Sequence, residues 1–437
     1  MKKTFLPLAI GLALAAPFIG SAQEKTEKEF YQRPSYWTPY DQRGVNRFET
    51  SKAEDSIPFQ GLRVRFGAGF TQSFQGLKHS TKAELPLYQM GPGFNLAQAN
   101  LNTDVQLADG IRLHLATYLS ARHHNETWVK GGYIQFDKLP FKGQFWKGLM
   151  ELATIKIGHM EINYGDQHFR RTDGGMAIYN PFVENYIVDA FSTEIGGEIY
   201  LKKNGLFGMV GVTNGTINSS INKQAPDIDK DSSKSPAVYF KAGIDKQVTS
   251  KLRVRLSGSA YMNQNSQRNV LYAGDRTGSN YFGVLEPKGA DLKANFTSGR
   301  FSPNFTRNIQ AVMLNGFVKY AGLEIFGTYE TAKGNAATAA DRTKRKMDQI
   351  AIEGIYRLGA KENLFLGARY NTVDAEMPGL AEEININRTS LAAGWYLTQN
   401  VLLKSEIVNQ KYKNFAATDL RNGGKFNGYV VQAVIGF

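Results

Sequence analysis

Pairs of basic side chains spaced two residues apart are the feature of this sequence that is best suited to binding anions. The run Leu-Arg-Val-Arg occurs twice, at residues 62–65 and 252–255. Successive side chains of a strand point to opposite faces, so both arginines of a run would share one face. Rings of arginine or lysine draw anions into pores. The side chains expected to line such a pore are Arg63, Arg65, Arg112, Lys156, Arg253, Arg255, Arg369 and Arg388.

Carboxylates are expected on the same inward strand faces as the basic residues, so a second interpretation of the basic residues remains open. Glu194, Glu198 and Glu324 are expected to point inward with the basic residues. The two sets could pair with one another and only stiffen the wall. Basic residues are the majority, and the chain has a formal net charge of +13. We therefore expect a weak preference for anions.

The segment 166–182 combines basic side chains with apolar ones such as Phe169 and Phe182. A loop that met only water would not need those apolar groups. We expect the segment to fold inward and narrow the pore, although an external lid packed on its neighbours is the alternative. The side chains that this constriction loop would expose to solute are His168, Arg170 and Arg171.

Sixteen segments show the period-two alternation of half-buried strands. They are residues 61–74, 94–108, 111–122, 127–138, 151–164, 191–203, 206–215, 237–247, 251–263, 307–321, 323–333, 346–358, 363–373, 385–398, 401–412 and 425–437. Tight links, such as 109–110, alternate with long polar ones, such as 263–307. Short periplasmic turns and long external loops are typical of transmembrane barrels. Residues 61–437 are therefore predicted to form an all-β, antiparallel transmembrane β-barrel of about 16 strands, with both ends in the periplasm.

The two ends of the chain carry signals for export and assembly. Residues 1–22 have the positive start, apolar run and small residues of a signal peptide. Residues 23–60 are expected to form a periplasmic N-terminal extension, which either docks into the barrel mouth or remains a tether. The last strand ends on an apolar face that resembles the assembly signal of outer-membrane barrels, carried here by Tyr429, Val431, Ile435 and Phe437.

Composition and motifs disfavour several other classes of protein. The sequence has no cysteine, so it cannot be a disulfide scaffold. Its six histidines lie outside the sequence contexts of serine hydrolases and zinc proteases, and it has no Walker loop. We expect no enzyme activity, no metal, no cofactor and, for an exported chain, no nucleic acid. A soluble periplasmic protein, and a plugged structural or secretion-partner barrel, remain as alternatives.

Three short runs resemble a known family. They are Gly-Tyr-Ile-Gln-Phe at 132–136, Ile-Lys-Ile-Gly-His at 155–159 and Gly-Val-Thr-Asn-Gly at 211–215. Their order resembles that of the phosphate-selective porins O and P and, more closely, of porin-like proteins of Bacteroidota. Glu161 stands where such porins usually carry a basic residue. The resemblance thus implies the porin class, without implying phosphate selectivity.

Together these patterns predict an outer-membrane porin for passive diffusion of small hydrophilic solutes, anionic or neutral. The expected partners are outer-membrane lipid and lipopolysaccharide, the barrel assembly machinery and further copies of the chain in a homotrimer.

Overall fold

The computed structural model describes residues 37–49, 59–120, 127–217, 235–266, 268–275, 277–292, 297–337 and 342–437. The predicted signal peptide, residues 1–22, lies outside the described residues. Residues 23–36 and 50–58 of the predicted extension also lie outside the described residues. Within the described part, no helix has both the length and the apolar character needed to cross a membrane.

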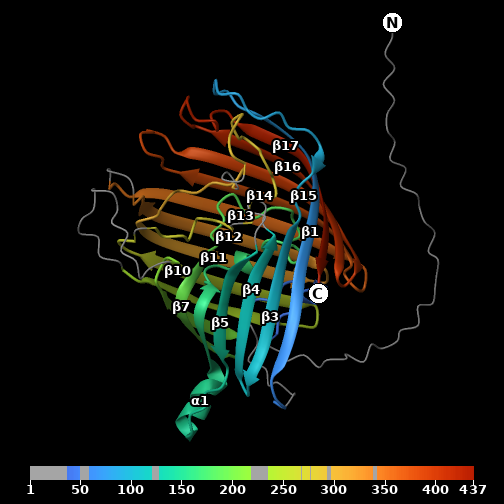
Figure 1. Ribbon diagram of the computed structural model, residues 1–437, viewed down its shortest axis with the longest axis vertical. Coiled ribbons are helices and arrows are strands. Elements are labelled where there is room, and N and C mark those ends of the chain that lie inside the picture. The colour runs from blue at the N-terminus through green and yellow to red at the C-terminus, as the bar shows by residue number, and fades with distance from the viewer. Residues whose placement is uncertain are drawn as a thin grey trace, which may run out of the picture.

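Sixteen long antiparallel strands of the described chain close into one barrel, which confirms the predicted fold (Figure 1). They are β1 (Arg63–Ser80), β3 (Gln98–Ala108), β4 (Ile111–Ser120), β5 (Trp128–Phe136), β6 (Ala153–Glu161), β7 (Thr193–Lys203), β8 (Leu206–Thr213), β9 (Ala237–Gln247), β10 (Leu252–Asn263), β11 (Asn308–Tyr320), β12 (Leu323–Asn335), β13 (Arg345–Leu358), β14 (Leu364–Ala375), β15 (Ile384–Thr398), β16 (Val401–Lys413) and β17 (Lys425–Gly436). A two-residue strand, β2 (Gly93–Phe94), also pairs with β1.

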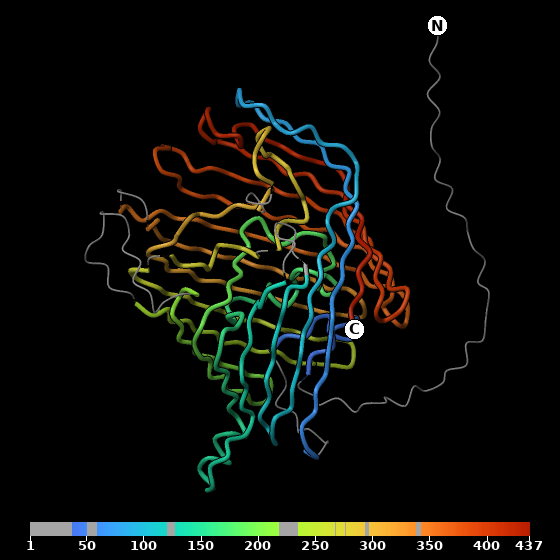
Figure 2. The backbone as a smooth tube through the Cα atoms, in the orientation of Figure 1, coloured from blue at the N-terminus to red at the C-terminus, as the bar shows by residue number. Residues whose placement is uncertain are grey.

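Strand β1 closes the barrel because it has a different partner on each side. Residues 63–71 pair with β3, and residues 69–80 pair with β17. Strand β1, in blue, and strand β17, in red, therefore run side by side (Figure 2). Closure joins the first and last long strands of the described chain, as a sheet exposed to lipid requires.

The strands alternate between an apolar outer face and an inner face rich in polar groups. In β16, for example, Ile407 is 63% exposed on the outside, whereas Glu406 is 1% exposed on the inside. Leu314, Leu366 and Leu391 on other strands are also exposed outward. Such an apolar outer band matches the hydrocarbon of a bilayer.

The links at the two ends of the barrel differ in length. Two-residue turns join β3 to β4, β11 to β12 and β15 to β16 at one end, and long loops join strands at the other. By the usual arrangement of outer-membrane barrels, the end with short turns faces the periplasm. The exception at this end is the link between β5 and β6, which contains the helix α1 (Gln144–Leu152).

The described part of the N-terminal extension lies inside the periplasmic mouth. We call residues 37–49, which include the short 3-10 helix η1 (Gln42–Gly44), the strap. Trp37 is fully buried, and the Tyr40 hydroxyl donates to the Asp104 carboxylate at 2.8 Å. At the rim, the Gln42 backbone N–H donates to the Gln399 carbonyl at 2.9 Å. In this part of the extension the chain is docked rather than tethered.

The predicted assembly residues lie on the outer face of the last strand. Tyr429, Val431, Ile435 and Phe437 are all exposed there, while the alternate residues Val430 and Val434 are fully buried inside. The Phe437 backbone N–H donates to the Ala68 carbonyl at 3.1 Å, and the Phe437 carbonyl accepts from the Ala68 N–H at 2.8 Å. The terminal residue thus takes part in the seam that closes the barrel.

Deletion of Phe437 should lower the amount of assembled barrel, because it removes both seam hydrogen bonds and the terminal lipid-facing aromatic. The measurement is the fraction of outer-membrane protein that shifts mobility on heating before electrophoresis. Phe437→Tyr, which keeps the backbone and the ring, should assemble as the wild type does. Undiminished heat-modifiable protein after the deletion would contradict the assignment of an assembly signal.

Candidate solute passage

The barrel interior is largely occupied by the link between β6 and β7. We call residues 162–192 the inner loop; nearly all of them are buried. The inward polar side chains of the wall satisfy its backbone N–H groups. Asn371 accepts from Ile187 at 2.7 Å, and Glu406 accepts from Val183 at 3.0 Å. A buried backbone needs such partners, so the polar inner face of the barrel is what allows this loop to enter.

Apolar side chains of the inner loop pack on apolar patches of the wall. Phe182 and Ile178 lie in one cluster with Phe365 of β14. Ile187 and Val188 lie in a larger cluster that continues towards the external side. The Lys404 ammonium donates to three carbonyls of the loop, those of Ala177, Asn180 and Phe182, at 2.8 to 2.9 Å.

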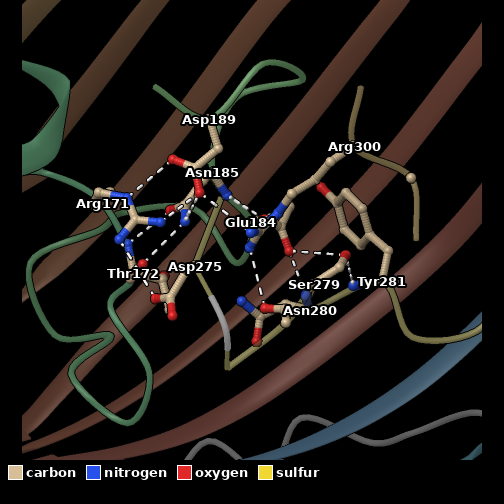
Figure 3. A network of polar contacts seen from close by, with 12 residues as sticks. Arg171, Thr172, Glu184, Asn185, Asp189, Asp275, Ser279, Asn280, Tyr281 and Arg300 are labelled. Atoms are coloured by element: carbon tan, nitrogen blue, oxygen red, sulfur yellow. Dashed lines mark hydrogen bonds and ion pairs between the residues drawn. The ribbon is translucent and has the colours of Figure 1, made fainter. Parts of the chain in front are cut away.

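A second long link, between β10 and β11, fastens the inner loop from the external side. We call residues 264–307 the clamp loop, of which 267, 276 and 293–296 are not described. Arg171 of the inner loop pairs with Asp189 at 2.5 Å and reaches Asp275 of the clamp loop at 3.5 Å (Figure 3). Glu184 pairs with Arg300 at 2.7 Å. The two loops form one buried network of charges.

The network changes the acidity of its carboxyl groups. Burial by itself would raise the pKa of Asp275, but the Arg171 guanidinium lowers it, to about 2. Burial likewise opposes ionisation of Glu184, whose pKa is nevertheless held below its usual value by Arg300 and by other groups including backbone N–H donors. Both carboxylates are therefore ionised at neutral pH and hold the loops together.

Arg65, Arg253 and Arg255, at the end of the barrel with short turns, each pair with carboxylates. Arg65 pairs with Asp104 and stacks on the rings of Trp37 and Tyr40 of the strap. Arg253 pairs with Asp245 at 2.7 Å. Arg255 pairs with Asp166 of the inner loop at 2.7 Å and with Glu49 of the strap at 2.8 Å. Arg63 is half-buried at the start of β1.

The remaining predicted wall residues are distributed around the interior. Arg369 pairs with Glu353 at 2.8 Å, and Arg388 donates to the Gln410 side chain at 2.6 Å. Arg112 donates to the Gln135 side chain at 2.5 Å. Lys156 is half-buried and lies over two aromatic rings, those of Tyr133 and Tyr200.

The constriction loop differs from expectation in the exposure of its basic side chains. The segment lies inside the barrel, but the Arg170 and Arg171 side chains are each only 3% exposed. Arg170 lies 3.5 Å from Glu353, and His168 bonds to Glu161 at 2.8 Å. The two guanidinium groups are largely covered because a buried cation needs carboxylate partners, and the interior supplies them. His168 and Arg171 nevertheless line a cavity of the interior.

Open space remains along one side of the interior, between the wall strands β3 to β7 and the inner loop. A cavity of about 260 Å³ extends there from the strap to Lys130. A second cavity of about 130 Å³ extends to the external ends of β4 and β5. Three residues, Lys130, His159 and Thr193, line both cavities, so the two adjoin. We call these two neighbouring cavities together the passage.

The passage is lined by cationic, titratable and aromatic side chains together. Lys156 and Lys202 lie towards its periplasmic end, with Tyr133 and Tyr200 beside them. Three histidines line it as well, His114, His159 and His168. Among the described residues, no group of three or more His, Cys, Asp or Glu side chains is arranged to hold a metal ion.

Lys130 was missed by sequence reasoning for a specific reason. Strict alternation from Gln135, which is fully buried inside, would place residue 130 on the lipid face. The pairing of β4 with β5 shifts between Ala116 and Thr117, where Gly131 and then Val129 are the partners and Lys130 is skipped. A bulge of this kind reverses the faces of the following residues. Lys130 therefore points inward and pairs with Asp173 of the inner loop.

Comparisons with known proteins agree with this architecture. Neither a protein-family model nor a curated protein matches the chain. The outer membrane channel DcaP of Acinetobacter baumannii is similar, with 9% identity and a TM-score of 0.52 over 86% of this chain and 98% of that one. In-vitro folded OmpT, an outer membrane protein of Vibrio cholerae, has 11% identity and a TM-score of 0.51 over 87% and 99%. An anion-selective porin from Comamonas acidovorans has 11% identity and a TM-score of 0.50 over 86% and 100%.

The closed barrel, its apolar outer band and these neighbours define the class of protein. The chain is an integral β-barrel of the outer membrane. Its fold is that of the porin-like barrels. In the described part of this chain, sixteen long strands surround an interior that loops partly fill.

Acid should loosen the loops inside the barrel. The ionised Asp275 stabilises the folded protein fully only above the pKa of Asp in the unfolded chain, about 3.9. This stabilisation is lost as the pH falls towards the lower pKa of Asp275 in the folded protein. Current fluctuations of the protein in planar bilayers should therefore increase between about pH 4 and pH 2, the latter being the Asp275 value.

Asp275→Asn tests the same contact at neutral pH. Breaking a buried charge pair costs about 3–5 kcal/mol, so this variant should fluctuate already at pH 7 and respond less to acid than the wild type. Identical current noise of both proteins across the whole range would contradict the role of Asp275.

Proposed function

We propose that this chain is an outer-membrane porin that lets small hydrophilic solutes diffuse passively through the passage, with a weak preference for anions. The observation that carries the proposal is the pair of adjoining cavities along β3 to β7, which share Lys130, His159 and Thr193. Solute would move between the wall and the inner loop rather than through the centre of the barrel.

A Coulombic argument supports the anion preference. Fixed positive charge in a narrow, low-dielectric channel raises the local anion concentration more than the same charge on an open surface. Lys156 and Lys202 line the periplasmic half of the passage directly. Arg63, Arg65, Arg253 and Arg255 would add to the positive field at the inner mouth. Their contribution is reduced by the carboxylates that pair with Arg65, Arg253 and Arg255.

The neighbours and the sequence resemblance support a channel of the same general kind. One structural neighbour is named an anion-selective porin, and another an outer membrane channel. The short runs that resemble phosphate-selective porins include the β5 and β6 walls of the passage. We propose in addition that the protein assembles as a homotrimer by way of the barrel assembly machinery and contacts lipopolysaccharide.

A plugged barrel without an open pore is the second candidate, and one observation favours it. The strap fills part of the periplasmic mouth, where Glu49 pairs with Arg255 and Lys241 at 2.8 and 3.0 Å. In this alternative the protein is a structural or secretion-partner barrel, and the cavities are filled with water that does not exchange with a bulk solute flow.

Replacing Lys156 and Lys202 by glutamine should lower the anion-to-cation permeability ratio. A unit charge about 8 Å from an ion in water-like surroundings is worth about 0.5 kcal/mol, or roughly twofold in occupancy. The ratio is obtained from reversal potentials across a salt gradient. The preference of the wild type should itself weaken as the Debye length falls from about 10 Å at 0.1 M to about 3 Å at 1 M salt.

The matched control is Lys319→Gln with Lys361→Gln, two lysines at the periplasmic end but outside the passage lining. This pair should change the ratio little. A wild-type channel that prefers cations would refute the proposed selectivity. An equal loss in both double variants would move the selectivity out of the passage, most directly to the arginines of the inner mouth.

Deletion of residues 37–49 distinguishes an open channel from a plugged one. The strap lines the larger cavity, so its removal should raise the single-channel conductance of a working porin by widening an existing path. A wild type that does not conduct at all, together with conductance that appears only after the deletion, would establish the plugged barrel. Heat-modifiability of both proteins serves as the control for folding.

A further inference from the structure

Helix α1 projects from the periplasmic end of the barrel and exposes an apolar face (Figure 1). Four side chains on adjacent turns form this face: Phe145 is 72% exposed, and Trp146, Leu149 and Leu152 are 36–38% exposed. Residues three and four apart in a helix share one face. Phe141, in the approach to the helix, extends it, with its ring centroid 5.3 Å from that of Trp146. Large exposed apolar groups gathered in this way mark an interaction surface.

The opposite face of the helix is polar, and two further lysines precede the helix. Gln144, Lys147 and Glu151 lie on it, and Lys142 is exposed just before the helix begins. Lys138 is also exposed, although it pairs with Asp109 at 2.8 Å. A short helix with aromatic and leucine residues on one side and lysines on the other is typical of segments that lie in a membrane interface.

Helix α1 lies next to two strands of the barrel wall, β6 and β7. The helix leads directly into β6 and contacts β6 and β7. At this end of those strands Ile157, Ile199 and Leu201 point outward and are about half exposed. In a membrane these wall residues meet lipid, so α1 adjoins a part of the wall that contacts the bilayer.

We propose that α1 is an interfacial anchor that binds the phospholipid leaflet on the periplasmic side of the outer membrane. Phe141, Phe145, Trp146 and Leu149 enter the boundary between headgroups and acyl chains. Lys142 and Lys147 bind the phosphates of anionic headgroups. Such basic groups are attracted to anionic lipid surfaces, and an amphipathic tryptophan is stable at this depth. The proposal does not depend on channel activity, since a plugged barrel would use the same anchor.

Lipid contact is tested by fluorescence of the full-length protein in vesicles that contain brominated phosphatidylcholine. The chain has four tryptophans, so the signal of Trp146 is the difference between the wild type and Trp146→Phe. That difference signal should be quenched by bromine placed near the headgroup end of the acyl chain. Quenching by acrylamide from water, with none by brominated lipid, would overturn the proposal.

Headgroup preference is tested with spin-labelled phosphatidylglycerol in vesicles of phosphatidylcholine. The wild type should associate with phosphatidylglycerol more strongly than with phosphatidylcholine. The double variant Lys142→Gln with Lys147→Gln should lower this ratio of association by about twofold. The matched control, Lys246→Gln with Lys251→Gln, changes two exposed lysines at the same end of the barrel but away from α1. An equal loss in both double variants would reduce the effect to general charge and overturn a site on α1.

A second copy of the chain is the other occupant that the experiment can detect. Trp146 shielded from both acrylamide and brominated lipid, in a protein whose size in detergent falls when Phe145 and Leu149 are replaced by serine, would assign the face to an oligomer contact. That result would also overturn the lipid anchor, while leaving the proposed channel untouched.

Discussion

The polar inner face of the barrel is the constraint on which the rest of this structure depends. A loop that enters a barrel loses water from its backbone, and every buried N–H and C=O then needs another partner. Asn371 of β14 and Lys404 and Glu406 of β16 supply such partners to the inner loop. The same side chains could not face lipid, so the alternation that makes the barrel suit a membrane also prepares its interior for the loop.

Charge pairing determines how the interior is arranged. The interior has many cations, and a buried cation without a partner is costly. Carboxylates from four sources meet them: the wall, the inner loop, the clamp loop and the strap. Arg255 illustrates this, because it joins Asp166 of the inner loop to Glu49 of the strap. One guanidinium thus connects three segments that are far apart in the sequence, and the strap and inner loop become parts of one packed unit.

Open space is left where this packing is least complete. The pairing of β5 with β6 extends over only residues 132–136 and 155–159. The passage adjoins this part of the wall, next to the bulge that turns Lys130 inward. Filled and open regions of the interior therefore lie side by side. A porin and a plugged barrel would share this fold. They would differ only in whether the strap leaves the periplasmic mouth of the barrel open.

The sequence by itself determined the barrel and the faces of its strands. Alternation every two residues depends on local backbone geometry, so the strand ranges, the sixteen-strand closure and the outward place of Phe437 could be predicted. What the arginines do in the interior could not. The contact of Arg171 with Asp275 depends on how two loops pack, and contacts over about 100 residues leave no local sequence pattern. The inward orientation of Lys130 was not predicted for a related reason, since a single bulge reverses the side-chain faces of the strand residues beyond it. Only the tertiary structure decided which charges are paired, because pairing depends on which segments are brought together in the interior.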